Sequence, residues 1–408
     1  MTSSTYVEAP TGVPVLDVDP FSDALLHDPY TYHAQLREIG PLAWIPKYAI
    51  YATGRHEQMR AIFADHKSYI SSAGVGLANF NKEPPFRPKS LILEADPPSH
   101  TQARTILSRI LSPGTVTQIR ESFTKEADAL LDEILDASCR KEVVDGVKCI
   151  GEAYPLKVFP DAVGLESQGR ENLLLYGDMI FNAFGPRNNL LARSAEKVQP
   201  VTDWIMAHCK RDMLRPGGFG DQIYQAADAG EISHEEAPML VRSFLSAGVD
   251  TTVNGIGNAL WCLASNPDAY AKLHADPGLA RAAFEESLRY ESAVQTFFRT
   301  TSCDVTLAEI NIPSGSKVLT VLAAANRDER KWPNAERFDI ERRPTGHMAF
   351  GSGIHGCVGQ VVARLEGELI LAAIAKRFRR IELAGEPTRR LNNTLRALGS
   401  LPLRLTPA

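Results

Sequence analysis

Near its C-terminal end the chain reads Phe350-Gly351-Ser352-Gly353-Ile354-His355-Gly356-Cys357-Val358-Gly359. A single cysteine stands in this glycine-rich loop, where glycines free the backbone to wrap around a bound group and to point N–H groups at one atom. Apolar residues at helical spacing follow over 360–378, so we expect a helix whose positive end favours the Cys357 thiolate. Such a sulfur suits an axial ligand to haem iron. A buried structural cysteine is the alternative interpretation.

A second informative stretch lies inside a long helix that we expect over residues 233–265. Ser233 and Glu236 fit a capping box at its start, and Asn266-Pro267 fits its end. Its middle reads Ala247-Gly248-Val249-Asp250-Thr251-Thr252, which is poor helix material because glycine and β-branched threonines have low helix propensity. Threonine hydroxyls also bond to preceding carbonyls, so we expect the helix to open locally here.

The order F-x-x-G-x-x-x-C-x-G from Phe350 to Gly359 resembles the haem-ligand loop of the cytochrome P-450 family, and Ala247 to Thr251 resembles its A-G-x-[D/E]-T motif. The resemblance runs from about residue 19 to 406. It implies a mainly α fold of triangular-prism shape with minor β-structure, a central long helix, haem b as cofactor and O2 as co-substrate. It also implies that Cys357 ligates the iron, that Thr251 hydrogen-bonds the dioxygen and that Asp250 relays protons from solvent. Further contacts with the haem are implied for Ala247, Gly248 and Phe350.

A porphyrin carries two propionates that need cationic or donor partners. Four residues match the family's positions for these partners, namely His100, Arg104, Arg299 and His347. His355 is a weaker fifth candidate. Glu286 and Arg289 share one face of a helix expected over 279–290. By the resemblance they join Arg342 in a structural trio with no catalytic role.

Arg242 is flanked by apolar residues, and a buried charge in such a setting needs an anionic partner. A bound anion, a protein carboxylate or solvent reached by snorkelling would each satisfy it. Ser243, Ala247 and Thr251 follow one another at i, i+4 and i+8, so Ser243 faces the same side of the helix as Thr251.

Several segments closely resemble the bacterial subfamily that oxidises para-substituted benzoic acids, notably para-methoxybenzoate; they are residues 86–96, 181–186, 240–254 and 294–300. The subfamily's carboxylate-binding positions match Arg87, Ser90, Arg242 and Ser243. Its apolar and aromatic walls match Leu93, Phe181, Phe184, Val294 and Phe297. A carboxylate held far from the iron would direct the para substituent toward it while the phenyl walls hold the ring.

The reaction implied by this resemblance is oxidative O-demethylation of a 4-methoxybenzoate-type acid with formaldehyde release, or hydroxylation of a para-alkyl group. A different small aromatic or phenolic methyl ether is the alternative substrate. Lys89 lies inside the first anion-binding stretch, where a close relative can have a neutral residue. It either points outward or brings a second polar contact into the site.

Length and composition favour one large domain over residues 19–408 behind a flexible N-terminal segment, residues 1–18. The 408 residues are 44% apolar, and no linker or repeat divides them. The net charge of −5 gives no general case for a nucleic-acid or membrane partner. Six scattered cysteines without a CxxC pair suit a reducing cytosol, and the polar N-terminus has no apolar leader, so we expect a cytoplasmic protein. No self-complementary apolar stripe is visible in the sequence, which favours a monomer.

The secondary structure expected elsewhere is mostly helical from 55 to 266, with a further helix over 29–39. Strands are expected at 42–45, 48–51, 301–307, 317–321 and 401–405.

We expect electrons from NAD(P)H to arrive through a separate [2Fe–2S] ferredoxin and its reductase. The chain has no glycine-rich dinucleotide turn between a strand and a helix, and its length leaves no room for a fused flavin reductase beside the implied fold. Two other function classes are a haem-based gas sensor and a peroxygenase. The Asp250–Thr251 pair disfavours both, because neither needs a proton relay.

Overall fold

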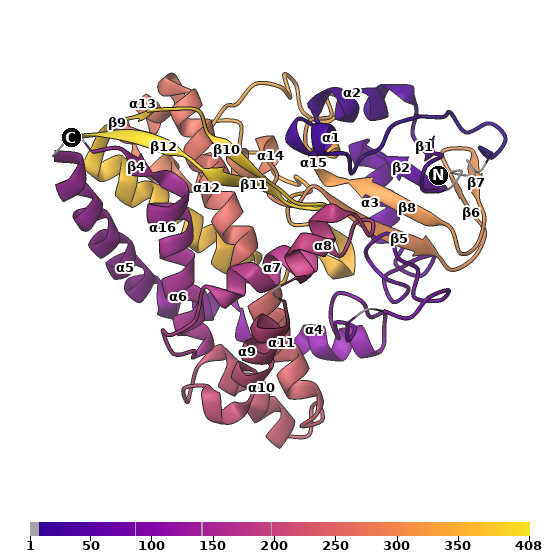
Figure 1. Ribbon diagram of the computed structural model, residues 1–408, viewed down its shortest axis with the longest axis horizontal. Coiled ribbons are helices and arrows are strands. Elements are labelled where there is room, and N and C mark those ends of the chain that lie inside the picture. Colours follow the sequence, from indigo (N-terminus) through magenta and orange to yellow (C-terminus); the bar gives the residue numbers. More distant parts are fainter. Residues whose placement is uncertain (1–7, 86, 140–141, 197) are drawn as a thin grey trace.

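The computed structural model describes residues 8–85, 87–139, 142–196 and 198–408. The outline is triangular, with helices filling the left and lower parts of Figure 1 and the main sheet at the upper right. The helices are α1 Asp23–His27, α2 Tyr30–Ile39, α3 His56–Ala64, α4 Ser99–Ile110, α5 Pro113–Cys139, α6 Ala153–Val163, α7 Asn172–Asn182, α8 Asn189–Ala195, α9 Val198–His208, α10 Phe219–Asp228, α11 Glu236–Ala247, α12 Asp250–Ser265, α13 Pro267–Ala275, α14 Ala280–Tyr290, α15 Leu322–Ala325 and α16 Gln360–Arg377. A π-helical stretch spans Val147–Glu152, and 3₁₀ turns span Arg211–Met213, Pro277–Leu279 and Gly353–His355.

The strands are short and come from both ends of the chain. They are β1 Ala43–Ile45, β2 Ile50–Thr53, β3 Tyr69–Ile70, β4 Val144–Asp145, β5 Thr296–Thr301, β6 Val305–Leu307, β7 Ile310–Ile312, β8 Lys317–Val321, β9 Phe378–Leu383, β10 Thr388–Leu391, β11 Arg396–Ser400 and β12 Pro402–Pro407. The main sheet has the order β1-β2-β8-β5-β3, in which β2 and β8 run parallel with Tyr51 opposite Val318. The predicted mainly α architecture with minor β-structure is confirmed.

The predicted strand over 301–307 is wrong in its extent. β5 ends at Thr301, and the backbone turns before β6 begins at Val305. The N–H of Ser302 donates to Ser68 O and the Asp304 carboxylate accepts from Ser314 N, so polar contacts replace a continuous ladder at this point.

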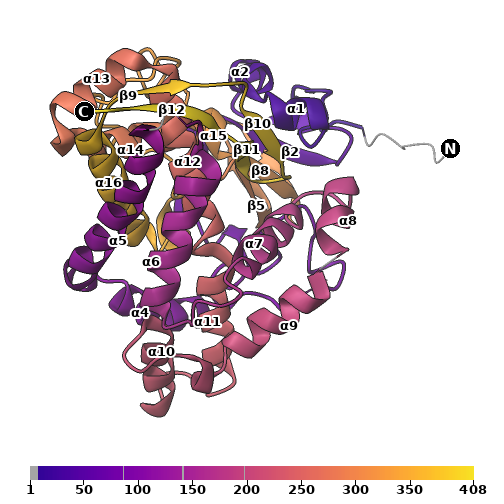
Figure 2. The same cartoon turned by 60° about the vertical axis from the view of Figure 1, so that its left-hand side comes forward.

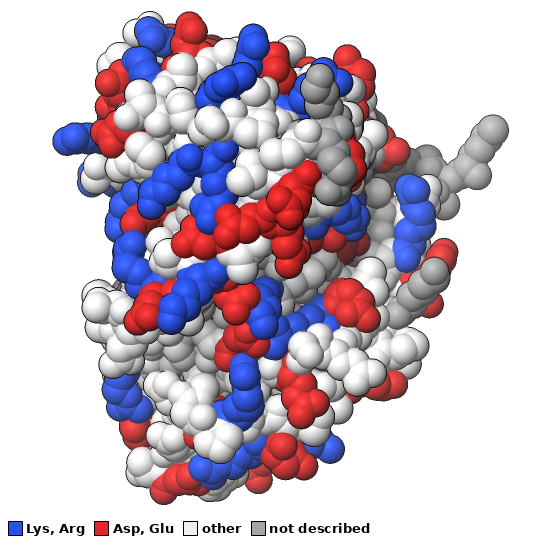
Figure 3. Space-filling view, turned by 90° about the vertical axis from the view of Figure 1, so that its left-hand side faces the viewer, with Lys and Arg blue, Asp and Glu red and all other residues white. Residues whose placement is uncertain are grey.

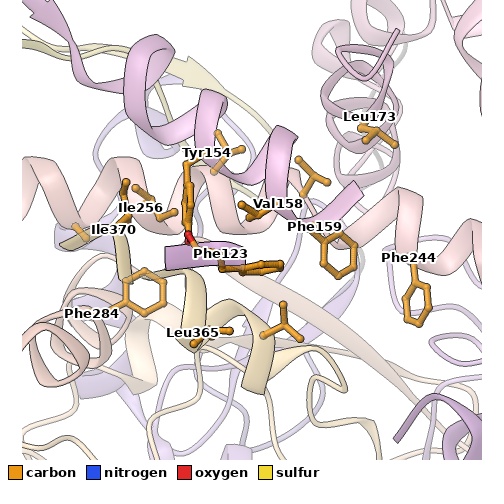
Figure 4. Packing of buried hydrophobic residues seen from close by; sticks show 14 of the residues in the cluster. Phe123, Tyr154, Val158, Phe159, Leu173, Phe244, Ile256, Phe284, Leu365 and Ile370 are labelled. Carbon is orange, nitrogen blue, oxygen red and sulfur yellow. The ribbon is translucent and has the colours of Figure 1, made fainter. Parts of the chain in front are cut away.

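The core surrounds α12, which is buried along most of its length. This helix packs against α14, α16, α7 and the π-helical stretch. Figure 4 shows how aromatic and aliphatic side chains from several helices converge beside it, among them Phe123, Tyr154, Phe284 and Leu365. A helix buried on most sides is suited to carry a site through the middle of a domain.

A layer of helices formed by α7, α8 and α9 lies beside α11 (Figure 2). Leu173, Tyr176 and Ile180 on α7 are buried, as is Ile205 on α9. Within this layer, α7 supplies residues to one wall of the cavity described below.

The single helix predicted over 233–265 is two helices in the structure, α11 and α12, interrupted at Gly248 and Val249. The Thr251 hydroxyl donates to Ala247 O at 2.9 Å, which is the local opening expected of a threonine hydroxyl. Gly248 has no room for a side chain, since an added Cβ would lie 2.2 Å from the Phe159 ring. The predicted capping box is confirmed, because Ser233 and Glu236 exchange hydrogen bonds of 2.9 and 3.2 Å.

Part of the N-terminal segment that we expected to be flexible is described. Residues 1–7 lie outside the described residues, as does Phe86. Val13 and Leu16 are buried, and Leu16 N donates to Trp44 O on β1 at 2.9 Å. The division into a short segment and one domain stays a prediction.

Within the described ranges, no helix is both long and apolar enough to cross a membrane. On the face shown in Figure 3, basic and acidic side chains alternate and form no extended patch of one sign.

Candidate active site

One large cavity lies where α4, α7, α11, α12 and β5 meet the loop that precedes α16. Its empty volume is about 1820 Å³, including space open to solvent. Predicted site residues line it in large number, namely Arg87, Ser90, Leu93, Arg104, Phe181, Phe184, Arg242, Ser243, Ala247, Gly248, Thr251, Val294, Phe297, Arg299, Phe350 and Cys357. Residues that the sequence distributes over 270 positions therefore meet around one space.

The Cys357 loop is bent by two glycines with positive φ, Gly351 at 66° and Gly353 at 69°. A side chain at Gly353 would collide with the backbone, since its Cβ would lie 2.1 Å from Phe63 O. Cys357 N donates to Phe350 O at 2.7 Å, which closes the loop.

The Cys357 sulfur faces the cavity and sits ahead of α16. Burial raises the pKa of its thiol, while the backbone N–H groups of Gly359 and Gln360 and the Arg104 guanidinium lower it. A bound metal cation would deprotonate the sulfur outright.

A cluster of basic side chains borders the cavity near this loop. Arg104 donates to Gly356 O, and the Arg299 guanidinium lies 4.8 Å from the centre of the Phe63 ring. Burial lowers the pKa of Arg299 to about 10. The His100 ring lies behind His355, with ring centres 4.3 Å apart, and burial lowers the pKa of His100 to about 4.

His347, which we expected to contact a haem propionate, is engaged by Glu285 in the structure, and its contact with the haem stays a prediction. The His347 ring does not line the cavity, and its Nε2 lies 2.7 Å from Glu285 Oε2. The turn at Gly346, with φ of 84°, leads the chain past the cavity before His347, and the Ala349 N–H donates to the other ring nitrogen. His355, the weaker candidate, lines the cavity instead.

A haem fits the chemistry of this space. Cys357 offers one soft donor, the surroundings are largely apolar, and Arg104, Arg299 and His355 offer positive or donor groups for acid side arms. The Nε2 atoms of His100 and His355 are buried and lack a hydrogen-bond partner among the described residues, with Asp96 3.9 Å from the latter. In the described part of the chain, no three or more His, Cys, Asp or Glu side chains gather to hold a metal. A metal at Cys357 would therefore take its other ligands from a macrocycle.

Asp250 and Thr251 are neighbours in sequence but point to different places. Thr251 lines the cavity, whereas Asp250 is 2% exposed and lies against Arg390 at 2.9 Å and Asn254 at 3.1 Å. Burial raises the pKa of Asp250, and the Arg390 guanidinium opposes that rise. The proton-relay role of this pair stays a prediction.

The aromatic wall forms as the sequence predicted. The Phe181 and Phe184 rings are 5.7 Å apart at nearly a right angle, and Phe184 lies 5.8 Å from Phe297. Leu93 and Val294 complete this wall. These contacts leave a slot whose lining suits a flat aromatic ring.

The four predicted carboxylate-binding residues lie together, and each already has a hydrogen-bond partner within the protein. Arg87 binds Glu94 through two hydrogen bonds of 3.0 Å, and Ser90 Oγ accepts from Leu93 N. Arg242 is 4% exposed and donates to the carbonyls of residues 88 and 89, each at 3.1 Å. Among the described residues Arg242 forms no ion pair, so the anionic partner expected for it is not a protein carboxylate there. Ser243 donates to Met239 O.

Lys89 points away from the cavity. Its ammonium group donates to Ser72 O at 3.0 Å and lies over the Phe80 ring. Of the two positions that we expected for Lys89, the structure has the outward one.

The trio of Glu286, Arg289 and Arg342 meets in the core. Arg289 donates to both carboxylate oxygens of Glu286 at 2.7 and 2.8 Å, and Arg342 donates to the same carboxylate at 3.1 Å. Arg289 also donates to the carbonyls of Asn326 and Ala335. The arrangement joins α14 to the segment ahead of the Cys357 loop.

Sequence reasoning missed several residues of the site. Tyr176, Ser246 and Glu366 line the cavity, and Glu94 holds Arg87. Ser246 lies at i+3 from Ser243, so helical spacing from a residue already chosen could have found it. The Arg87–Glu94 pair crosses a turn, and no spacing rule indicates it.

Comparisons with known proteins agree with this site. Residues 156–277 and 278–405 match the family model described as Cytochrome P450. A Rhodopseudomonas palustris protein, cytochrome P450 CYP199A2, is 53% identical over 397 residues, covering 97% of this chain and 96% of its own. Cytochrome P450 107B1 of Saccharopolyspora erythraea is 30% identical over 406 residues, covering 96% and 98%. The solved structure of cytochrome P450 CYP109Q5 from Chondromyces apiculatus has a TM-score of 0.80 and 29% identity, covering 96% of this chain and 99% of that one.

Proposed function

Because the chain belongs to the cytochrome P450 family, we propose that it oxidises a small aromatic carboxylic acid, by O-demethylation of a 4-methoxybenzoate-type substrate. The coarser activity follows from the family. The protein is a haem-thiolate monooxygenase that uses haem b, O2 and electrons from external redox partners.

A single observation carries the substrate class. Arg242 lines the cavity, is almost fully buried, and forms no ion pair within the described residues. A buried guanidinium that binds only carbonyls keeps a net charge, which a substrate carboxylate would neutralise. Ser243 and Ser90 lie at the same end and offer hydroxyl groups, and the rings of Phe181 and Phe184 would hold the substrate ring.

The remaining site residues have the following roles in this proposal. Cys357 would ligate the haem iron, and Arg104, Arg299, His100 and His355 would receive the propionates. Ala247, Gly248 and Phe350 would contact the ring. When bound, the haem supplies the oxygen-activating chemistry by which one oxygen atom enters a substrate C–H bond and the other leaves as water.

Two residues of the chain manage protons. Thr251 lines the cavity, and its hydroxyl would hold a proton next to the bound dioxygen. Asp250, which does not line the cavity, would replace that proton after it is transferred. The methoxy carbon gains a hydroxyl group. In the resulting hemiacetal, the bond between the phenolic oxygen and the former methoxy carbon breaks, which gives the para-phenol and formaldehyde. One O2, two electrons from NAD(P)H and two protons are consumed, and one water is formed.

We propose a [2Fe–2S] ferredoxin with its NAD(P)H reductase as the electron source, and a cytoplasmic monomer as the working form. The docking face would be the Cys357 side of the haem, where Arg364 or other exposed basic residues would contact the ferredoxin. In the structure, Arg364 is bound to Glu285 and Gln360 and lies over the Phe350 ring at 4.4 Å. Arg364 is therefore better suited to support the Cys357 loop than to dock a partner.

The test is a binding titration of the holoenzyme with para-methoxybenzoate and with its neutral amide. We expect the acid to shift the haem spin state far more than the amide, and Arg242→Leu to abolish that difference. Turnover with ferredoxin and reductase should release formaldehyde. An equal response to both ligands in the unaltered protein would reject the carboxylate clamp. It would favour the alternative substrate, a neutral aromatic or phenolic methyl ether. The observation that supports this alternative is the ion pair by which Glu94 neutralises Arg87.

A further inference from the structure

Few charged side chains lie at the polar end of the cavity, which is the end that binds the carboxylate in the proposed function. Arg87 and Arg242 both line it. Behind Arg87 lies Glu94, 3% exposed, which accepts from two Arg87 nitrogens at 3.0 Å and from Ser90 N at 2.9 Å. A bidentate guanidinium and a backbone donor on one carboxyl group are the partners of an ionised carboxylate.

Two other nearby cations are directed elsewhere. Lys317 interacts with Glu94 electrostatically, but its ammonium group donates to the carbonyls of residues 73, 74 and 76 and does not line the cavity. The Lys89 ammonium donates to Ser72 O and does not line the cavity. Arg242 donates to two carbonyls, which carry no net charge. Two guanidinium groups and one carboxylate therefore leave this end of the cavity with a net charge of one positive unit.

We propose that Glu94 is a specificity-determining residue that sets this charge, so that the site selects aryl monocarboxylates over aryl dicarboxylates. The inference rests on the proposed function, since it concerns the same carboxylate-binding end. Glu94 does not line the cavity and acts through Arg87, so it is a positioning residue for the site's charge.

The physical reason is the low dielectric of the buried site. A monoanion brings the end of the cavity to neutrality, whereas a dianion leaves one uncompensated negative charge close to Glu94. At an effective dielectric constant of about 20, a unit charge roughly 10 Å away changes an equilibrium constant about tenfold. Without Glu94, two positive charges would face the ligand, and a dianion would become the matched partner.

A purely structural role for Glu94 predicts a different result. Glu94 binds Arg87 and Ser90 N, so its loss would loosen residues 87–94. Loosening would weaken every ligand, whether neutral, singly charged or doubly charged. Selectivity between ligands of different charge therefore distinguishes the two roles.

The experiment measures dissociation constants by calorimetry on the holoenzyme, which does not depend on turnover. The ligands are 4-methoxybenzoate, 4-methoxybenzamide and the dianion 4-methoxyphthalate. The variants are Glu94→Gln and, as a control away from the cavity, Glu38→Gln, an exposed carboxylate paired with Arg330. We expect Glu94→Gln to improve phthalate binding about tenfold relative to 4-methoxybenzoate binding, and Glu38→Gln to leave this ratio unchanged.

An unchanged ratio of phthalate to benzoate binding in folded Glu94→Gln would overturn the inference while leaving the proposed function intact. If the unaltered protein binds no aryl carboxylate, both fall together. If Glu94→Gln does not fold, the unaltered protein still tests the inference with two ligands. These are 4-methoxyphthalate and its monomethyl ester, in which the carboxyl group next to the clamped carboxylate is esterified. The bulkier monoanionic ester should bind about tenfold more tightly, and tighter binding of the dianion would contradict the charge assignment.

Discussion

Asp250 forms an ion pair of 2.9 Å with Arg390, although the two residues are 140 positions apart in the chain. Arg390 continues to Asp178 at 3.0 Å, and these two residues line a second hollow beside α7, α8 and α9. The other oxygen of Asp250 has no hydrogen-bond partner in the described ranges. The acid of the oxygen motif is thus separated from the substrate cavity and connected toward a different face of the molecule through Arg390.

Replacing Arg390 should destabilise the protein in a pH-dependent way. Burial raises the pKa of Asp250 and Arg390 lowers it, so Arg390→Gln should raise that pKa further. A carboxyl group with a raised folded-state pKa favours folding at low pH, and that contribution is lost as pH rises through the folded pKa. We expect Arg390→Gln to lose about 3 kcal/mol of unfolding free energy at pH 8 and clearly less at pH 5.

Urea unfolding at the two pH values measures this difference. Arg193→Gln is the control, because Arg193 lines the same second hollow but donates only to a carbonyl of its own helix. Equal losses at both pH values for Arg390→Gln would mean that Asp250 does not respond to Arg390.

Removing the Thr251 hydroxyl should separate electron use from product formation. The hydroxyl faces the cavity and donates to Ala247 O at 2.9 Å. Thr251→Ala removes a proton donor from the cavity, so formaldehyde formed per NAD(P)H consumed should fall about tenfold or more, whereas Thr251→Ser should stay close to the unaltered protein. Both quantities are measured in one assay with ferredoxin and reductase. An equal loss in the serine variant would assign the effect to helix geometry.

Cys357→Ala should give a folded protein without a thiolate-ligated haem. Cys357 supplies the one sulfur atom that lines the cavity among the described residues, so no other soft donor replaces it. We expect the reduced protein with CO to lose its thiolate-type absorption band, while the circular dichroism spectrum stays helical. Cys262→Ala, a buried cysteine on α12, is the control and should keep the band. An unchanged band in Cys357→Ala would exclude this residue as the ligand.

Local motifs gave the parts of this site that depend on backbone shape. The Cys357 loop, the opening at Thr251 and the capping box at Ser233 each follow from residues within ten positions of one another, because glycine freedom and hydroxyl hydrogen bonds act over that range. The aromatic wall was found through the subfamily resemblance, residue by residue.

Pairings between distant side chains were not predictable in this way. Arg390 reaches Asp250 from a β-hairpin, and nothing in either local sequence indicates the other. His347 and His355 both precede Cys357 closely, but His355 lines the cavity and His347 is bound to Glu285, which their positions in the sequence do not indicate. Glu94 holds Arg87 across a turn that belongs to no regular element.

The Glu286 trio offers a test of a fully buried charge. Arg289 is 0% exposed, and its guanidinium is neutralised by Glu286. Glu286→Gln would leave that charge without its counter-ion, which we expect to cost about 3–5 kcal/mol of unfolding free energy. Glu341→Gln, which breaks an exposed pair with Lys272, should cost less than about 1 kcal/mol. Denaturant midpoints measure the loss of unfolding free energy in both variants. Similar losses would show that the buried trio stabilises the protein no more than the exposed pair of Glu341 and Lys272.

Lys317 should make stability rise with pH above neutrality. Its ammonium group is buried and donates to the carbonyls of Ala73, Gly74 and Gly76, and burial lowers its pKa to about 7. In the unfolded chain a lysine titrates near its ordinary value of about 10.4. Between these values the unfolded chain holds a proton that the folded chain has released, so folding is increasingly favoured as pH rises, by at most about 1.4 kcal/mol per pH unit.

Lys317→Met removes this titration, although it also removes donors from three carbonyls. The informative quantity is therefore the slope of the unfolding free energy between pH 7 and 9, measured in urea, and not its absolute value. We expect that slope to be smaller in Lys317→Met than in the unaltered protein, while Lys47→Met, which changes a half-exposed lysine paired with Asp19, keeps the original slope. The same slope in all three proteins would mean that Lys317 keeps its proton in the folded state, held there by the three carbonyls against the effect of burial.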